Sequence, residues 1–200
     1  MATERFYNLK PKKKHILVDS ILHCIQKEDI DTLSITDIAN EAEISRGTFY
    51  TYFKDKHDAI YTMFYYKIQD FVDRFKAIII INKGDYFRSV TDGFVELTEF
   101  FKKGKYFKAI KNILRIADLN TFSIYAKNMM SDFRRVYVWI FENSNLMNFG
   151  IKDEKQAKSL TELVFSLYAS MLSRLAYDID VDSIKNDFKY KLSIIERGVM

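Results

Sequence analysis

The sequence contains few residues that interrupt helices and only one thiol. Its 200 residues include 1 Pro and 6 Gly. Because proline and glycine are disfavoured inside helices, this scarcity predicts a mostly helical chain. The 1 Cys, Cys24, excludes an internal disulfide and fits a reducing compartment.

Long apolar runs are also lacking. The longest purely apolar run, Ala77 to Ile81, is far too short to span a bilayer. The N-terminal residues show no apolar signal region. We therefore expect a soluble, cytoplasmic protein with no membrane partner.

Recognisable catalytic and metal-binding motifs are missing as well. The histidines are His15, His23 and His57, all near the N-terminus. No Ser-His-acid set, glycine-rich phosphate loop or HExxH pattern is present. Adjacent His23 and Cys24 point to different faces of a helix, which makes them a poor chelate, and Cys24 is expected in the core. The sequence predicts no enzyme activity, no metal site and no cofactor.

Charge is balanced overall but grouped locally. The net charge is +4, yet the first 67 residues carry equal numbers of acidic and basic side chains. Basic residues gather in an arm and in a second cluster, with acidic residues between them. The arm contains Arg5, Lys10, Lys12, Lys13 and Lys14, and the second cluster contains Arg46, Lys54 and Lys56. The arm lysines are either solvated or in contact with an anionic partner such as a nucleic acid, and the sequence leaves both open.

Apolar spacing predicts about nine helices. Residues 1–13 are expected to form an arm that is loose until packed or bound. Apolar residues that recur three and four positions apart then mark successive helical faces. The expected helices cover residues 12–26, from Ser34 to about 42, 46–53, 56–81, 87–101, 106–117, 122–141, 153–177 and from about 182 to 197.

The most informative block runs from Ser34 to Lys56. Ser34 is a good N-cap, and Asp37 can complete a capping box with it. A turn from Glu43 to Ser45 leads into a second short helix, whose Phe49 and Phe53 face inward. Its opposite face carries Gly47, Thr48, Tyr50 and Thr51. Two short helices joined by a tight turn indicate a helix-turn-helix, whose second helix can enter the major groove of DNA.

Polar groups flank this small, polar face. Tyr50 and Tyr52 can donate hydroxyl hydrogens to phosphates, although Tyr52 is equally suited to packing. Lys56 stands at the start of the next helix, where its charge and the helix N-terminus both favour a phosphate.

The block resembles the DNA-binding module of the TetR family. The resemblance lies in Ile38-Ala39, Ser45, the run from Gly47 to Phe53, and Lys56. One departure is Ala42-Glu43 in the turn, where the family usually has Ala-Gly. A left-handed backbone there would cost a glutamate more than a glycine.

The resemblance implies roles for individual residues. Tyr50 and Lys56 would contact phosphates, and Thr36, Arg46, Thr48 and Thr51 would contact bases or lie near them. Residues 1–56 would form an N-terminal three-helix DNA-binding domain. The candidate DNA-binding residues are Ser34, Thr36, Arg46, Gly47, Thr48, Tyr50, Thr51, Tyr52, Lys54 and Lys56.

Residues 57–200 are expected to form a larger helical domain for ligand binding and dimerisation. By the resemblance, its central helices would enclose an effector pocket. Methionine and aromatic side chains re-pack around varied apolar ligands, although such stripes are more often plain core. The candidate pocket residues are Phe94, Phe101, Phe107, Ile110, Met129, Met130, Phe133 and Tyr137.

The resemblance also implies that the last two helices dimerise as a four-helix bundle. A palindromic operator demands a two-fold dimer, although an apolar helix face is more often core than interface. The candidate interface residues are Leu160, Leu163, Val164, Leu167, Met171, Phe188, Leu192 and Ile195.

The sequence as a whole predicts a homodimeric regulator that binds double-stranded DNA at a palindromic operator. We expect a repressor that an apolar or aromatic small-molecule effector releases from DNA. The alternative is a helical protein-interaction module of the same fold without DNA-binding function. An enzyme would need a site that the sequence does not reveal.

Overall fold

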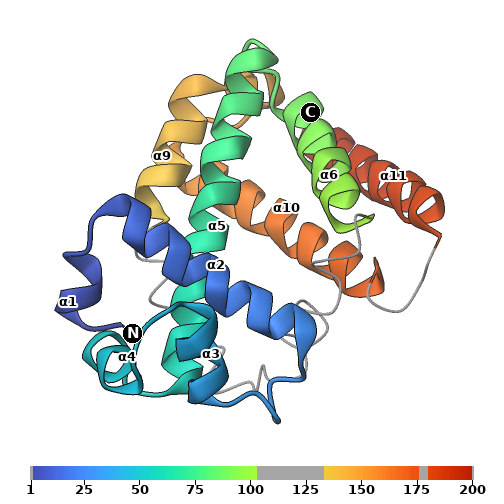
Figure 1. The fold of residues 1–200 in the computed structure, drawn as a ribbon. Helices are drawn as coiled ribbons and strands as arrows, with labels where there is room; N and C mark the ends of the chain where they lie inside the picture. Colours follow the sequence, from blue (N-terminus) through green and yellow to red (C-terminus); the bar gives the residue numbers. More distant parts are fainter. Residues whose placement is uncertain (1, 103–132, 176–179, 200) are drawn as a thin grey trace. The chain divides into compact units, whose positions relative to one another are not determined.

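The computed structural model describes residues 2–102, 133–175 and 180–199. Every regular element in these ranges is a helix, and none of them contains a strand (Figure 1). The expected all-α fold is therefore confirmed. The chain divides into two compact units, and among the described residues the first ends at Asp70 and the second starts at Phe71.

The first unit is a set of short helices that precede one long helix. It contains α1 (Glu4–Tyr7), α2 (Pro11–Lys27), α3 (Ile35–Glu41), α4 (Arg46–Tyr52) and the first part of α5 (Lys56–Ile81). The predicted boundaries of α2, α4 and α5 are confirmed to within one residue. Pro11 stands at the start of α2, where its missing N–H leaves no hydrogen bond unmade.

The N-terminal residues, expected as an arm that is loose until packed or bound, are packed in the structure. Residues 4–7 form α1, and Phe6 is fully buried. Its ring centroid lies 5.1 Å from that of Phe53 and 5.7 Å from that of Tyr66. Burial of Phe6, worth about 1.5–3 kcal/mol, acts together with the hydrogen bonds of Thr3 to the end of α4 against the entropy lost on ordering these residues.

The core of the first unit draws apolar side chains from all of its helices. These side chains leave α3 and α4 no freedom to rotate about their axes, because each contributes a fully buried residue to the same cluster. The largest members include Phe6, Ile21, Ile25, Leu33, Ile38, Phe49, Phe53 and Met63.

The second unit contains the end of α5 with α6 (Tyr86–Lys102), α9 (Arg134–Asn143), α10 (Glu154–Leu175) and α11 (Val181–Val199). A short 3-10 helix, η1 (Asn145–Phe149), lies in the interval between the helices expected over residues 122–141 and 153–177. The helix expected over residues 106–117, and the first part of the one expected over 122–141, lie outside the described residues.

Aromatic rings fill the core of the second unit. Phe94 of α6 stacks on Phe188 of α11 with a centroid distance of 3.8 Å, and Tyr168 of α10 lies beside both. The hydroxyl of Tyr168 donates to the carbonyl of Val90. Gly93 allows this approach, since a Cβ there would lie 3.0 Å from the Tyr168 hydroxyl.

Candidate nucleic-acid interface

The interface begins with a capped helix. The backbone N–H of Asp37 donates to the Ser34 hydroxyl at 3.2 Å, and the Asp37 carboxylate accepts from the Ser34 N–H at 2.9 Å. This is the capping box expected from the sequence. Hydrogen bonds from the side chain and backbone of Ser34 lower the pKa of Asp37, so its charge persists at the positive end of α3.

The turn between α3 and α4 contains a left-handed residue. Glu43 has a φ of 53°, the conformation considered for this position from the sequence. The N–H of Ile44 donates to the carbonyl of Ala39 at 2.9 Å and closes the turn. Left-handed backbone is strained for a residue with a Cβ, and the surrounding hydrogen bonds hold it in place.

A second cap starts α4. The Ser45 hydroxyl accepts from the N–H of Thr48 at 3.0 Å, and the hydroxyls of these two residues lie 2.9 Å apart. The Thr51 hydroxyl donates to the carbonyl of Thr48 at 2.6 Å. Both threonine hydroxyls are therefore engaged in local hydrogen bonds.

The outer face of α4 is open. Arg46 and Gly47 are exposed, Thr48 and Thr51 are half-buried, and Tyr50 is 48% exposed. A Cβ at Gly47 would contact only the Ser45 hydroxyl, at 3.7 Å. The fold therefore tolerates a side chain at this position, and its absence leaves room for another molecule. Ser34, Thr36 and Lys54 are exposed nearby in the sequence.

The inner face of α4 is closed. Phe49 and Phe53 are fully buried with ring centroids 5.2 Å apart, as their spacing predicts. Tyr52 is also buried, so of the two roles considered for it the structure favours packing. The Tyr50 ring meets the edge of Phe49 and remains on the outer side.

Lys56 has partners that its sequence position does not suggest. Its ammonium group donates to the carbonyls of Ile30 and Leu33, at 2.6 and 2.8 Å. Lys56 thus ties the loop between α2 and α3 to the start of α5. An ammonium group has three N–H donors, so one remains for a phosphate.

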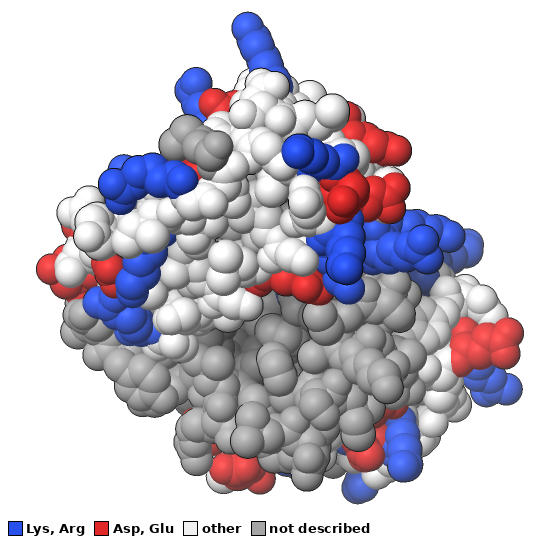
Figure 2. Space-filling model, turned by 180° about the vertical axis from the view of Figure 1, so that it is seen from behind, with Lys and Arg blue, Asp and Glu red and all other residues white. Residues whose placement is uncertain are grey.

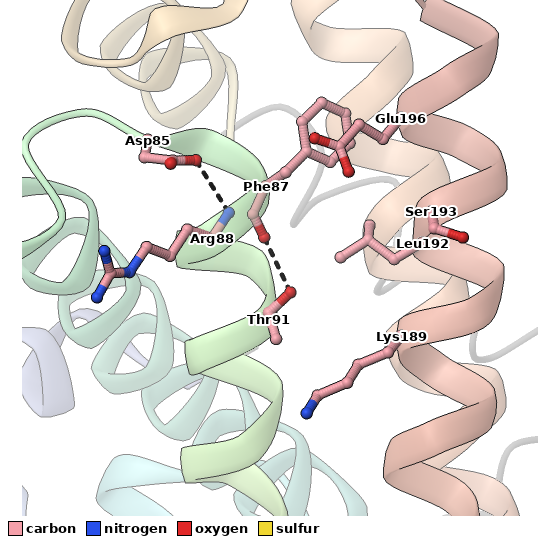
Figure 3. A pocket seen from close by; sticks show the side chains of 8 residues that line it. All are labelled: Asp85, Phe87, Arg88, Thr91, Lys189, Leu192, Ser193 and Glu196. Atoms are coloured by element: carbon pink, nitrogen blue, oxygen red, sulfur yellow. Dashed lines mark hydrogen bonds between the residues drawn. The ribbon is translucent and has the colours of Figure 1, made fainter.

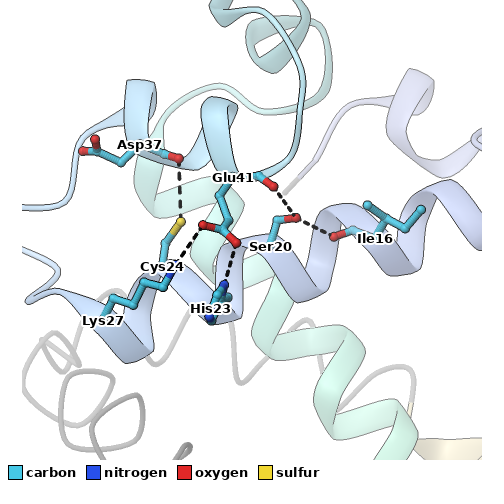
Figure 4. A network of polar contacts seen from close by, with 7 residues as sticks. All are labelled: Ile16, Ser20, His23, Cys24, Lys27, Asp37 and Glu41. Carbon is cyan, nitrogen blue, oxygen red and sulfur yellow. Dashed lines mark hydrogen bonds and ion pairs between the residues drawn. The ribbon is translucent and has the colours of Figure 1, made fainter.

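A polar network joins α2 to α3 (Figure 4). The Glu41 carboxylate lies 2.5 Å from Nδ1 of His23 and accepts from the Lys27 ammonium at 3.2 Å. Its backbone carbonyl accepts from the Ser20 hydroxyl at 3.2 Å. These contacts hold the end of α3 to α2. The Glu41 pKa is lowered, first by the hydrogen bond with His23 and then by the one with Lys27.

Cys24 lies beside this network and behaves as a core residue. It is 5% exposed, and its thiol lies 3.8 Å from the carbonyl of Asp37. Burial, together with the charge of Glu41, raises its pKa to about 11. A thiol that stays protonated at neutral pH is a poor nucleophile and a poor metal ligand.

Charges of both signs are interspersed on the surface. Figure 2 shows groups of Lys and Arg side chains separated by Asp and Glu, with no continuous basic face in that view.

The predicted effector pocket is only partly described. Phe94, Phe133 and Tyr137 are buried. Phe94 belongs to the α6–α11 stack, whereas Phe133 precedes α9 and Tyr137 lies on α9, with their ring centroids 6.4 Å apart. Burial, followed by the nearby Glu162 carboxylate, raises the Tyr137 pKa to about 12, so its hydroxyl is neutral. The remaining candidates, the Phe101 side chain, Phe107, Ile110, Met129 and Met130, lie outside the described residues.

A separate groove lies between α6 and α11 (Figure 3). Its volume is about 240 Å³, and charged side chains of both signs line it, including Arg88, Lys189, Asp85 and Glu196. It contains none of the predicted pocket residues, and its open, mixed lining does not select a ligand class.

The predicted dimer residues fall into two groups. One group is buried in the core of the second unit and consists of Leu160, Val164, Met171, Phe188 and Leu192. Of the other group, Leu163 is 53% exposed, and Leu167 and Ile195 are half-buried. The sequence reasoning missed Tyr190 and Ile194, which are 65% and 49% exposed one helical turn apart on α11.

Solved structures share this fold. FadR from Bacillus subtilis, solved in complex with stearoyl-CoA, is 17% identical, with a TM-score of 0.61 over 92% of this chain and 94% of that one. A TetR transcriptional regulator from Rhodococcus sp. RHA1 is 14% identical, with a TM-score of 0.58 over 92% and 94%. The fatty acid degradation regulator FadR from Bacillus halodurans is 13% identical, with a TM-score of 0.57 over 92% and 96%. Among curated proteins, none matches the sequence significantly.

A capped helix pair with a tight turn and an open outer face defines a helix-turn-helix. Residues 17–58 match the family model described as bacterial regulatory proteins, tetR family. This part of the chain, which holds the two capped helices, is thus similar to that family's N-terminal module, and the solved structures above share the fold of the chain. Among the described residues, no helix is long and apolar enough to cross a membrane, and no group of three potential metal ligands occurs.

Proposed function

We propose that this protein is a homodimeric transcriptional repressor that binds a palindromic operator through α4 and is released by a small-molecule effector. The observation that carries the proposal is the two-sided nature of α4. Phe49 and Phe53 fix its inner side in the core, while the side with Arg46, Gly47 and Tyr50 is open. A rigid helix with one free polar face is what the major groove accepts.

Different residues of this face contact bases and phosphates. Thr48 and Thr51 offer methyl groups to thymine, and Arg46 is placed for a base edge or a phosphate. Tyr50 and the third N–H of Lys56 contact phosphates, which fix the register on DNA. Thr36 contacts a base or lies near one, while Ser34 and Lys54 lie close to the backbone. Residues 1–56 form the DNA-binding domain of this proposal, and residues 57–200 the effector and dimer domain.

Dimerisation through α10 and α11 supplies the two-fold symmetry. Leu163 on α10 and Tyr190 and Ile194 on α11 are large apolar side chains exposed to solvent in a single chain. Burial of such side chains is the ordinary driving force for a dimer. Two copies of α4 then meet half-sites about 34–36 Å apart, one turn of DNA.

The proposed effector is apolar or aromatic and binds in the second domain. Support comes from the aromatic content of this domain and from the solved complex of Bacillus subtilis FadR with stearoyl-CoA, a relative in fold. The effector releases DNA only if it binds better to a state whose two α4 helices no longer match the operator. The protein's single tryptophan, Trp139 on α9, gives a fluorescence reporter for such binding. We propose that the protein acts in the cytoplasm and without catalysis.

The test uses two glycine substitutions in the whole chain. The probe is the duplex that the wild-type protein itself selects from a randomised pool, with binding measured by fluorescence anisotropy. Gly47→Ala places a methyl group on the open face of α4 and should weaken binding about tenfold, with thermal stability equal to or above that of the wild type. Gly198→Ala is the matched control, because a Cβ there meets no atom within 4 Å.

The outcomes separate the two classes of function. Wild-type binding by Gly47→Ala would exclude α4 from the groove. Failure of the wild-type protein to select any duplex would favour the protein-interaction module instead, and partners would then be sought for the same open face.

A further inference from the structure

The N-terminal segment, residues 2–9, completes the C-terminal end of α4. The backbone N–H of Thr3 donates to the carbonyl of Tyr52 at 2.9 Å. The Thr3 hydroxyl donates to the carbonyl of Thr51 at 2.7 Å. The last carbonyls of any helix lack partners within that helix. Here a residue 48 positions away in the sequence supplies them.

This segment is itself held by the core under α4. Phe6 is fully buried against Phe53 and Tyr66. The N–H of Phe6 donates to the carbonyl of Thr3 at 3.0 Å, which fixes Thr3 relative to the buried ring. A helix of 4 residues such as α1 has no stability alone. Its order comes from these contacts, so the segment and α4 hold each other in place.

We propose that Thr3 is a positioning residue for DNA recognition, setting the C-terminal end of α4 so that its outer face meets the bases. The proposal rests on the proposed function of α4. Thr51 links Thr3 to the outer face of α4, because its carbonyl accepts from the Thr3 hydroxyl while its own hydroxyl donates to the carbonyl of Thr48. A shift of the helix end moves Thr51 first and Thr48 next, and both lie on the face proposed to read the operator.

Positioning differs from a phosphate contact by the same segment. Arg5 lies two residues after Thr3 and is exposed, and Lys10 and Lys12 follow it in the sequence. Loss of a phosphate contact weakens binding to every DNA sequence and lowers the slope of log affinity against log salt by about 1. Loss of a positioning contact weakens the operator complex alone and leaves that slope unchanged.

The experiment compares Thr3→Val, Thr3→Ser and Arg5→Gln in the whole chain. Valine keeps the volume of threonine and removes the hydroxyl, whereas serine keeps the hydroxyl. Binding is measured against the duplex selected by the wild-type protein and against a scrambled duplex of the same length, over a range of salt concentrations.

Thr3→Val should lower the ratio of operator to scrambled affinity about three- to tenfold, the effect of one lost hydrogen bond, with an unchanged salt slope. Thr3→Ser keeps the hydroxyl and should therefore show the wild-type ratio of operator to scrambled affinity. Arg5→Gln should leave the ratio near that of the wild type and lower the slope for both duplexes, if Arg5 meets a phosphate; an unchanged slope assigns the segment to positioning alone.

Two results would overturn the positioning role. One is a Thr3→Val protein with the wild-type ratio. The other is an equal loss on both duplexes, which is what partial unfolding of the domain produces. If the wild-type protein selects no duplex at all, the proposed function of α4 fails and the role of Thr3 fails with it, a result distinct from either of these.

Discussion

At the scale of single residues, the threonines of α4 allow the roles of a methyl group and a hydroxyl in operator preference to be separated. The hydroxyls of Thr48 and Thr51 are bound to Ser45 and to the α4 backbone. A Thr48→Val substitution keeps the methyl group and should preserve operator preference. Thr48→Ser removes the methyl group and should relax preference at one thymine by about 1 kcal/mol, or about fivefold.

Selection from a randomised pool by each variant measures this effect directly. The base at the affected position should change from a preferred thymine to a mixture in Thr48→Ser alone. A Thr48→Val protein that relaxes preference as strongly as Thr48→Ser would show that the hydroxyl, and not the methyl group, reads the base.

Lys56 joins folding to binding in one side chain. Its two charge-assisted hydrogen bonds to Ile30 and Leu33 hold the loop before α3. Lys56→Ala should lower the free energy of unfolding by about 1–3 kcal/mol, measured by urea denaturation with far-UV circular dichroism. It should also lower the salt slope of DNA binding by about 1. A stability loss with an unchanged slope would restrict Lys56 to the loop.

At the scale of elements, the network between α2 and α3 predicts a pH dependence. The Glu41 pKa is lowered in the folded protein by His23 and Lys27. For a carboxylate with a lowered folded pKa, the stabilisation is present above the unfolded pKa and is lost as pH falls through the folded value. The contribution of Glu41 should therefore be complete at pH 7 and decline below about pH 5.

The measurement compares the wild type with Glu41→Gln in urea over this pH range. The difference in unfolding free energy should shrink as pH falls, because protonation gives the wild type the same neutral side chain as the variant. Asp187 also has a lowered pKa, from Lys191 and Arg174, and it titrates in both proteins, so it cancels in the difference. A difference that stays constant down to low pH would contradict the role of the Glu41 charge.

Sequence signals predict those elements whose cause is local. The Ser34–Asp37 box and the spacing of Phe49 and Phe53 each act within a few residues, and both appear as expected. The packing of α1 does not follow from such signals. Its 4 residues are too few to show a helical period, and its partners lie about fifty residues away. The hydrogen bonds of Lys56 could not be predicted for the same reason, because the tertiary fold determines which carbonyls lie near its ammonium group.

At the scale of the whole molecule, the apolar pattern of α10 and α11 could be predicted but its use could not. A helix that packs on its own chain and on a second copy has two apolar faces, and the stronger stripe is the inner one. Phe188 and Leu192 belong to that inner stripe, whereas Tyr190 and Ile194 stand on the outside. Exposure in a folded chain distinguishes these faces, and sequence spacing alone does not.

The outer face carries the last prediction, which concerns assembly. Ile194→Asp puts a charge on the face proposed to meet a second copy. An unpaired charge is costly to bury, so the substitution should convert the dimer to a monomer by sedimentation analysis, with unchanged helix content. Met147→Asp is the matched control, since Met147 is 70% exposed on η1 and lies outside α10 and α11. The monomer should lose affinity for the palindromic duplex and keep the weaker affinity for a single half-site. A dimer that survives Ile194→Asp, or a Met147→Asp protein that dissociates, would place the contact elsewhere and leave the spacing of the two α4 helices to another surface.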